Sequence, residues 1–178
     1  MNSKNKKNIF KELIGYLIVA IIAALFAIML RFFVIEPYIV PTPSMSPTLL
    51  VGDKVIVNKL KYKFSEIQRG DVVAFYSPYE EKYLVKRVIG LPGENITCTK
   101  EGKIFINGAD LNEKYIPEDF FIAYEEKSYN TDDSEYFLMG DNRNNSSDSR
   151  VFGNIEKNSI FGKVFFIYGP FSRIGKIY

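Results

Sequence analysis

Residues 83–93, Tyr-Leu-Val-Lys-Arg-Val-Ile-Gly-Leu-Pro-Gly, place two cations inside an otherwise apolar run. The apolar and β-branched residues predict a β-strand over 83–89 that ends in a glycine- and proline-containing turn. In strict alternation Lys86 falls on one face and Arg87 on the other, so one of the two cations points toward an apolar side. The pattern alone favours a solvated lysine at a strand edge over a buried one. A buried Lys86 would have a lowered pKa and a neutral amine able to accept a proton from a hydroxyl.

Short β-like runs continue on both sides of this strand, and turn residues such as Asn107-Gly108 separate them. Their alternation and their β-branched and aromatic content predict antiparallel hairpins in a mostly β domain. A polar stretch, Glu125 to Ser134, predicts a surface loop. The predicted strands are Lys54–Asn58, Asp71–Tyr76, Tyr83–Ile89, Asn95–Thr99, Lys103–Asn107, Tyr136–Met139 and Ile160–Tyr168.

An uncharged apolar run, Leu13 to Leu30, precedes the β-like part of the chain. Helical geometry gives it a length of about 27 Å, close to the roughly 30 Å hydrocarbon core of a bilayer. A retained anchor is favoured over a cleaved signal peptide, whose apolar region is usually shorter and ends at a small-residue site. The division predicted is a cytoplasmic segment at 1–12, an anchor at 13–35 and an extracytoplasmic domain at 36–178. The orientation follows from the positive-inside rule, because lysines cluster before the apolar run.

Composition limits the chemistry that remains. A chain of 178 residues with a net charge of +2 fits one medium domain and gives no support for a nucleic-acid partner. The absence of histidine excludes Ser-His-Asp and Cys-His catalysis and zinc sites that need imidazole. The single cysteine, Cys98, rules out an intramolecular disulfide, and its place in an alternating run predicts a buried strand residue rather than a nucleophile. Any general acid–base catalysis must therefore use Lys, Tyr or a carboxylate.

Two further segments carry groups able to take part in chemistry. In residues 41–49, Pro-Thr-Pro-Ser-Met-Ser-Pro-Thr-Leu, prolines flank Ser44 and predict a rigid, extended, non-helical chain. By composition this segment is a proline-rich spacer, whereas a fixed serine hydroxyl is the functional alternative. Residues 137–150, Phe-Leu-Met-Gly-Asp-Asn-Arg-Asn-Asn-Ser-Ser-Asp-Ser-Arg, predict a polar loop after a short strand.

Together these segments resemble the type I signal peptidase family, the membrane-anchored serine proteases that remove signal peptides. The resemblance covers the anchor, the Pro-Ser-Met-Ser-Pro segment, Arg69-Gly70-Asp71-Val72-Val73, the Lys86-Arg87 strand and the Gly-Asp-Asn-Arg to Asp-Ser-Arg block. It implies an antiparallel β-sheet catalytic domain with a fold like that of signal peptidases and LexA. The roughly 54 residues between Lys86 and Asp141 leave little room for the large extra β domain of some members, as in the single-span form common in Gram-positive bacteria.

The resemblance also implies roles for individual residues. It makes Ser44 the nucleophile, Lys86 the general base, Thr42 an oxyanion donor beside the Ser44 N–H, and Ser146 the hydroxyl that orients the lysine. Asp148 and Arg150 correspond to an ion pair that steadies the site, whereas Arg87 and Ser46 match no direct chemical role. Shallow apolar pockets for small substrate residues are expected near Tyr38, Val40, Leu84 and Val85.

The function expected is therefore cleavage of exported precursors after small-x-small (Ala-x-Ala) sites, without cofactor or metal. Expected partners are signal-peptide-bearing preproteins, the lipid bilayer of the cell membrane and the Sec translocation machinery. There are two alternatives. One is an anchored β domain without catalysis, such as an adaptor or an inactive paralogue, and the other is a LexA-like Ser-Lys protease. LexA-like repressors act in the cytosol and carry DNA-binding segments, for which the residues before Leu13 are too few.

Overall fold

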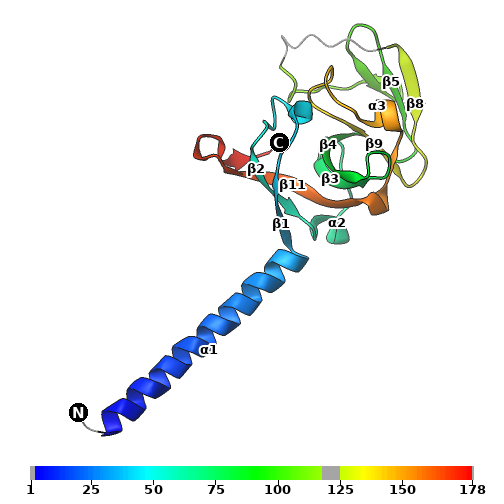
Figure 1. Ribbon diagram of the computed structural model, residues 1–178. Helices are drawn as coiled ribbons and strands as arrows, with labels where there is room; N and C mark the ends of the chain where they lie inside the picture. Colours follow the sequence, from blue (N-terminus) through cyan, green and yellow to red (C-terminus); the bar gives the residue numbers. More distant parts are fainter. Residues whose placement is uncertain (1–2, 118–124, 178) are drawn as a thin grey trace.

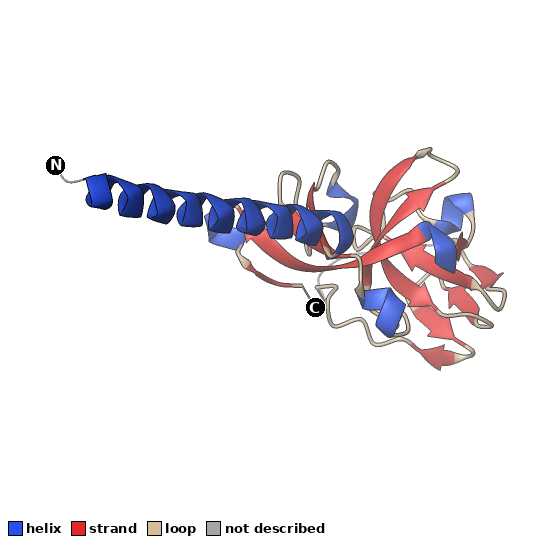
Figure 2. Cartoon of the chain, turned by 90° about the horizontal axis from the view of Figure 1, so that it is seen from below, coloured by secondary structure: helices blue, strands red, loops and turns tan. Residues whose placement is uncertain are grey.

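The computed structural model describes residues 3–117 and 125–177. Helix α1 (Ser3–Phe33) projects as a long rod from a β-rich body, as Figure 1 and Figure 2 show from two directions. The part of α1 from Phe10 to Arg31 is long and apolar enough to cross a membrane, and its side chains are not covered by the β-rich body. The helix ends at Phe33, and Ile35, the last residue of the expected anchor, already begins the first strand. Residues 1–2 of the expected cytoplasmic segment lie outside the described residues.

The larger sheet is antiparallel throughout and carries the strand that contains Lys86. Its strands, in order across the sheet, are β1 (Ile35–Ile39), β2 (Lys54–Asn58), β11 (Ile160–Gly169), β3 (Val72–Ser77), β4 (Lys82–Gly90), β9 (Glu135–Met139) and β10 (Ile155–Glu156), and β12 (Gly175–Lys176) pairs with β11.

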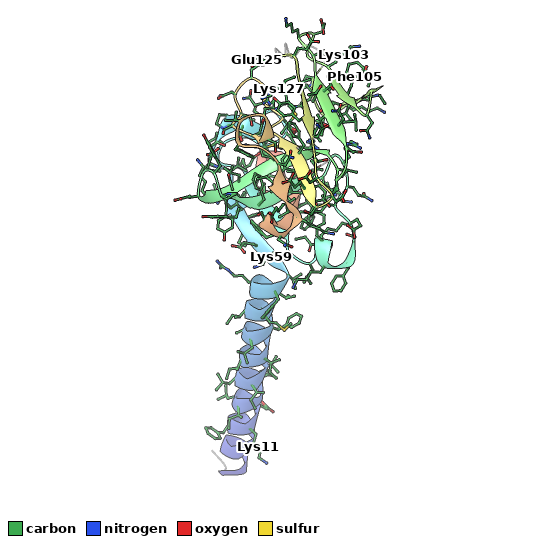
Figure 3. All side chains as sticks on the ribbon, turned by 90° about the vertical axis from the view of Figure 1, so that its right-hand side faces the viewer. Lys11, Lys59, Lys103, Phe105, Glu125 and Lys127 are labelled. Atoms are coloured by element: carbon green, nitrogen blue, oxygen red, sulfur yellow. The ribbon has the colours of Figure 1, made fainter. Side chains whose placement is uncertain are left out.

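A smaller antiparallel sheet lies at the end of the body that is remote from α1, where Figure 3 labels Lys103, Phe105 and Lys127. Its strands, in order, are β7 (Ala109–Asp110), β6 (Ile104–Ile106), β5 (Asn95–Cys98) and β8 (Lys127–Asn130). Helical elements of the β-rich body are single turns: η1 (Pro43–Met45), α2 (Lys61–Phe64), α3 (Ser149–Phe152), η2 (Lys157–Ser159) and η3 (Phe171–Arg173).

The seven strands predicted from sequence all form, with ends shifted by at most two residues, and the mostly β fold with one apolar helix is confirmed. Cys98 is buried in β5, as its alternating run predicts. The surface loop predicted over Glu125 to Ser134 is wrong in part, because Lys127–Asn130 form strand β8 against β5. This edge strand exposes most of its side chains, so it lacks the apolar alternation that identifies a half-buried strand.

The proline-rich segment also differs from its prediction as a uniformly extended chain. Pro37 lies within β1, which in the described part of the chain pairs only with β2 and is therefore an edge strand. Proline is tolerated in an edge strand because its missing N–H need not cost a hydrogen bond between strands. Ser44 lies in the one-turn 3₁₀ helix η1, with Pro43 at its first position. Proline suits that position because its φ is already close to the helical value and its absent N–H is not needed there.

One hydrophobic cluster lies directly beneath this segment. It includes Val40 and Met45 from the chain around η1, Val55 and Val57 from β2, and Val85 from β4. These side chains are at most 7% exposed. The turn that holds Ser44 and the strand that holds Lys86 therefore pack against the same hydrophobic cluster. This close packing fixes the distance between the turn and the strand.

Candidate active site

Ser44 and Lys86 meet although 42 residues separate them in the chain. The Lys86 Nζ donates a hydrogen bond to the Ser44 Oγ over 2.6 Å. Ser44 is half-buried, and only 2% of Lys86 is exposed. Arg87, on the opposite face of β4, is fully buried as well, so both cations of the strand lie inside the protein. The solvated strand-edge lysine that the pattern favours is therefore wrong.

Burial lowers the pKa of the Lys86 amine from 10.5 to about 8, because the charged form loses its water shell. Asp148, Glu80 and Asp141 oppose this shift through their negative charges, and the nearby Lys82 adds to it. The amine therefore exists in part as a neutral base near pH 8. A neutral amine beside a serine hydroxyl is the pair that a chain without histidine needs to generate a nucleophile.

Thr42 brings a second hydroxyl to the Ser44 side chain. Its Oγ1 lies 3.1 Å from the Ser44 Oγ, at hydrogen-bond distance. Thr42 is exposed and precedes η1 in an extended conformation, so its side chain is open to an incoming molecule. The arrangement brings together three of the groups predicted from sequence, two hydroxyls and one amine, at the mouth of one cavity.

That cavity measures about 20 Å³, room for little more than a methyl group. All four residues that the resemblance implies for substrate pockets line it, together with the Ser44 and Lys86 pair. They are Tyr38, Val40, Leu84 and Val85, and the structure adds Pro41, Met45 and Tyr83. Met45 was missed because the sequence pattern does not show which side chain of the 3₁₀ turn points inward.

The predicted ion pair between Asp148 and Arg150 is present. Arg150 donates from Nε and from Nη2 to the two carboxylate oxygens of Asp148, over 2.8 Å in each case. Asp148 is fully buried, caps α3 and also accepts the backbone N–H of Gly140 over 3.0 Å. The pair therefore ties the strand end at Gly140 to the loop that carries Ser146.

Ser146 lies in this loop, but the hydrogen bond to Lys86 that the resemblance implies is not present. The Ser146 Oγ is buried and has no hydrogen-bond partner in the part of the chain that the structure describes. It lies close to the backbone of Ser44, because a Cβ built on Gly140 would meet the Ser146 Oγ at 2.3 Å and the Ser44 carbonyl at 2.4 Å. A buried hydroxyl without a partner carries a cost, which makes it a candidate for a functional contact.

Asn142 fastens the same loop to the turn that carries Ser44. Its backbone N–H donates to the Ser44 carbonyl over 3.1 Å, and its Nδ2 donates to the Pro43 carbonyl over 3.2 Å. Sequence reasoning assigned Asn142 no individual role, since an asparagine in a polar loop is ordinary. The Gly-Asp-Asn-Arg motif was the only available signal.

Arg87 and Asp141 form a buried ion pair beneath this loop. Arg87 donates from Nε over 2.9 Å and from Nη2 over 2.7 Å to the two oxygens of Asp141, and neither side chain is exposed. Arg87 also donates to the Gly70 carbonyl over 2.8 Å, and its guanidinium lies 3.8 Å from the ring centre of Tyr115. Arg87, which matches no direct chemical role in the resemblance, therefore holds this loop next to Ser44 and Lys86.

Comparison with known proteins shows the family of the chain. Residues 13–169 match the family model described as "Signal peptidase, peptidase S26". The chain is 39% identical to the probable signal peptidase I-1 of Synechocystis sp., over 94% of this chain and 86% of that protein. It is 37% identical to signal peptidase I of Bacillus licheniformis, over 98% of this chain and 96% of that protein. A crystal structure of a signal peptidase I from Enterococcus faecalis aligns with a TM-score of 0.49 and 30% identity, over 56% of this chain and 97% of that one.

The chain therefore belongs to the signal peptidase family, peptidase S26, a group of membrane-associated peptidases that remove signal peptides from precursor proteins. The family match extends from the apolar helix to the end of β11, so it includes every element that forms the site.

Proposed function

We propose that this chain cleaves signal-peptide-bearing precursors with Ser44 as the nucleophile and Lys86 as the general base. The observation that carries the proposal is the 2.6 Å hydrogen bond between the Lys86 Nζ and the Ser44 Oγ, made by a lysine that is 2% exposed. The lowered pKa of Lys86 supports the assignment, because only the neutral amine accepts a proton.

The proposed reaction has two stages, formation of an acyl-enzyme and its hydrolysis. Ser44 Oγ attacks the carbonyl carbon of the scissile bond while Lys86 takes the hydroxyl proton, and the carbonyl oxygen gains the negative charge. Collapse of this intermediate breaks the C–N bond, and Lys86 returns the proton to the leaving amine. Water then attacks the acyl-enzyme with Lys86 again as base, and Ser44 regains its proton when the new carboxylate leaves.

The Ser44 N–H and the Thr42 hydroxyl are proposed to hold the oxyanion. In the free protein the Thr42 Oγ1 already lies 3.1 Å from the attacking oxygen. A rotation about one side-chain bond therefore suffices to turn its O–H toward a charge that develops next to Ser44. Donors that are in place before the reaction stabilise that charge without reorganising the site.

Specificity for small residues before the cut is proposed to follow from the cavity of about 20 Å³ beside Ser44. Val40 and Val85 are buried against the core, so the cavity cannot widen without repacking. An alanine methyl fits such a space, whereas a longer side chain clashes. The Ala-x-Ala preference expected from the resemblance has its physical basis here.

The substrate is proposed to bind as an added strand between β1 and β4. Within the described residues β1 pairs only with β2, and β4 pairs with β9 only from Arg87 onward, so residues 82–86 have a free edge. The Tyr38 hydroxyl donates to the Tyr83 carbonyl over 3.2 Å, which shows that this carbonyl faces β1. Main-chain groups on such edges are ready to pair with an extended peptide.

The membrane arrangement proposed places the N-terminus in the cytoplasm, the anchor in the apolar part of α1 and the catalytic domain, which begins with β1, outside. The apolar segment Phe10–Arg31 and the lysines that precede it support this orientation. The lipid bilayer and the Sec machinery would then bring emerging precursors to the cleft.

The test is cleavage of a peptide that contains an Ala-x-Ala site by the detergent-solubilised full chain. We expect cleavage at that site by the wild type and none above background by Ser44→Ala or Lys86→Ala, with all three proteins folded by circular dichroism. Lys103→Ala serves as the control, since Lys103 is an exposed lysine at the end of the body remote from α1 and does not line the cavity.

Retained activity in a folded Ser44→Ala or Lys86→Ala variant would remove the dyad assignment. Absence of cleavage by a folded wild type would contradict the proposed activity and favour an anchored domain without catalysis. Equal cleavage of peptides with Leu in place of either alanine would contradict the proposed specificity.

A further inference from the structure

A groove of about 560 Å³ lies beside the catalytic cavity, on the side that faces α1. Tyr38 and Tyr83 line both spaces, so the groove adjoins the cavity. Four aromatic rings, Tyr38, Tyr76, Tyr83 and Phe161, line the groove, and Lys59 lies at its edge nearest α1, at the base of the β-rich body in Figure 3. The groove is more than twenty times as large as the cavity that receives the residue at the cut.

Sheet register places Tyr76 and Tyr83 on the same face of the sheet as Val85, which lines the catalytic cavity. Tyr76 pairs with Tyr83 in the β3–β4 ladder, two positions from Ala74 and Val85. Directly opposed residues and residues two apart share a face of a sheet. Ala74 and Val85 belong to the hydrophobic cluster under the cavity, so the two tyrosines continue the same face outward.

The groove and the cavity also share their floor. Tyr38 and Phe161 pack against the hydrophobic cluster that contains Val40, Met45 and Val85 of the cavity, and Val57 of the groove is a buried member of that cluster. A peptide lying across the cavity would therefore run above a single hydrophobic cluster, with little room beside Ser44 and more room toward α1.

Counting residues along β1 shows which substrate side chain reaches the groove. Val40, Tyr38 and Glu36 follow one another at two-residue steps; Val40 and Tyr38 line the cavity, and Tyr38 and Glu36 line the groove. A bound strand advances by the same step and presents alternate side chains to one face. If the first residue before the cut lies opposite Val40 and the third opposite Tyr38, the fifth lies opposite Glu36, in the groove.

We propose that this groove is a subsite for a large apolar side chain, aromatic above all, at the fifth residue before the scissile bond. The proposal rests on the proposed function, because it needs a peptide bound along β1 and β4. The chain would then select its substrates at three alternate positions, with small side chains at the first and third residues before the cut and a large side chain at the fifth.

The surface of the groove fits an aromatic occupant. Tyr76 and Tyr83 are 41% and 56% exposed, so much of their ring surface remains to be covered. Their ring centroids are 5.4 Å apart at an interplanar angle of 69°, and the Tyr83 and Phe161 centroids are 5.2 Å apart at 83°. Edge-to-face walls of this kind leave ring faces and edges free to contact another ring. The Lys59 and Glu36 ion pair, 3.1 Å between Nζ and Oε2, neutralises both charges at the outer end.

The experiment measures kcat/KM of the full chain in detergent for peptides with alanine at the first and third positions. Phe and Ala are compared at the fifth position, and in separate peptides Phe is moved to the fourth or the sixth. We expect about a tenfold gain from Phe at the fifth position, as for burial of a large side chain. No comparable gain is expected at the fourth or sixth, whose side chains point to the other face.

Variants test the walls of the groove. Tyr76→Ala should bring the ratio of kcat/KM for the Phe peptide to kcat/KM for the Ala peptide close to one. Asn158→Trp places a large side chain in the groove from an exposed position and should have the same effect without removing a lining residue. Tyr79→Ala is the matched control, because Tyr79 is a 66% exposed tyrosine of the β3–β4 turn that does not line the groove, and it should keep the wild-type ratio.

Each outcome is decisive. Equal rates for Phe and Ala at the fifth position, with cleavage intact, would overturn the subsite and leave the proposed function standing. Equal gains at the fourth, fifth and sixth positions would also overturn it, since the effect would be partition into the micelle. A ratio unchanged in both groove variants would exclude this groove as the binding surface. Absence of all cleavage by the folded wild type would instead contradict the proposed function.

Discussion

The guanidinium of Arg87 makes two hydrogen bonds to the carboxylate of Asp141, and both side chains are completely buried. Arg87 is the immediate neighbour of Lys86 on β4, and Asp141 begins the loop that Asn142 fastens to Ser44. The ion pair therefore couples the strand that carries Lys86 to the loop that contacts Ser44. The pair also acts electrostatically, because the negative charge of Asp141 raises the pKa of Lys86.

Removing one partner of this pair should destabilise the domain strongly. Asp141→Asn leaves a buried guanidinium without its counter-charge, and we expect a loss of about 3–5 kcal/mol in the free energy of unfolding. Asp110→Asn, which disrupts the exposed Lys103 and Asp110 pair, should cost less than about 1 kcal/mol. Urea denaturation of both variants checks the difference, and similar losses would show that the buried pair contributes no more than a surface one.

Gly140→Ala should displace the loop from the Ser44 turn. A Cβ at this position meets the Ser44 carbonyl at 2.4 Å, and backbone cannot yield as a flexible side chain can. Overpacking of this kind costs about 1–3 kcal/mol, and we expect the cleavage rate to fall by more than about tenfold. Gly175→Ala is the control, because nothing lies within 4 Å of its added Cβ. Thermal unfolding and peptide cleavage are measured side by side; a fully active Gly140→Ala would show that the loop contact does not position Ser44.

Cleavage should rise with pH through an apparent pKa of about 8, because only the neutral Lys86 amine accepts the Ser44 proton. Glu80 raises the pKa of Lys86 and Lys82 lowers it. Glu80→Gln should therefore move the acid limb of the kcat/KM profile to lower pH, and Lys82→Gln should move it to higher pH. Shifts in the same direction for both variants, or a limb that neither moves, would contradict Lys86 as the titrating group.

Ser146→Ala should lower the activity of the protein without lowering its stability. The Ser146 hydroxyl is buried without a hydrogen-bond partner in the described structure, so its removal should not lower the free energy of unfolding. If the hydroxyl orients the Lys86 amine during the reaction, kcat should still fall by at least about tenfold, within the range for positioned proton-transfer groups. Ser149→Ala is the contrast, since the Ser149 Oγ accepts the Leu138 N–H over 2.9 Å and its loss should cost about 1–3 kcal/mol. An unchanged kcat in Ser146→Ala would remove the orienting role.

Thr42→Val should lower kcat by about 10² to 10³ if its hydroxyl holds the oxyanion. Thr42→Ser keeps the donor and should retain most of the rate. Because Thr42 is exposed, neither change should alter the unfolding transition. An equal rate for Val and Thr would leave the oxyanion to backbone N–H groups alone.

Seven of the strands, the apolar helix and the family resemblance could be predicted from the amino-acid sequence alone. Strands such as β2, β3 and β4 follow from alternation and β-branched content, which are local properties of the chain. The motifs around Ser44 and Lys86 identified the candidate catalytic pair because their order and residue types were enough for recognition. Strand β8 was missed, since an exposed edge strand has no apolar period to detect.

The burial and the pairing of these residues depend on the folded chain and could not be predicted from local sequence. Alternation along β4 could not show that Lys86 and Arg87 are both buried, because that depends on what distant segments place over each face. The Arg87 and Asp141 pair, the unpartnered Ser146 hydroxyl and the aromatic groove beside Tyr38 all join residues far apart in the chain. Desolvation and packing arise from the sum of such contacts, and it is desolvation that lowers the pKa of Lys86.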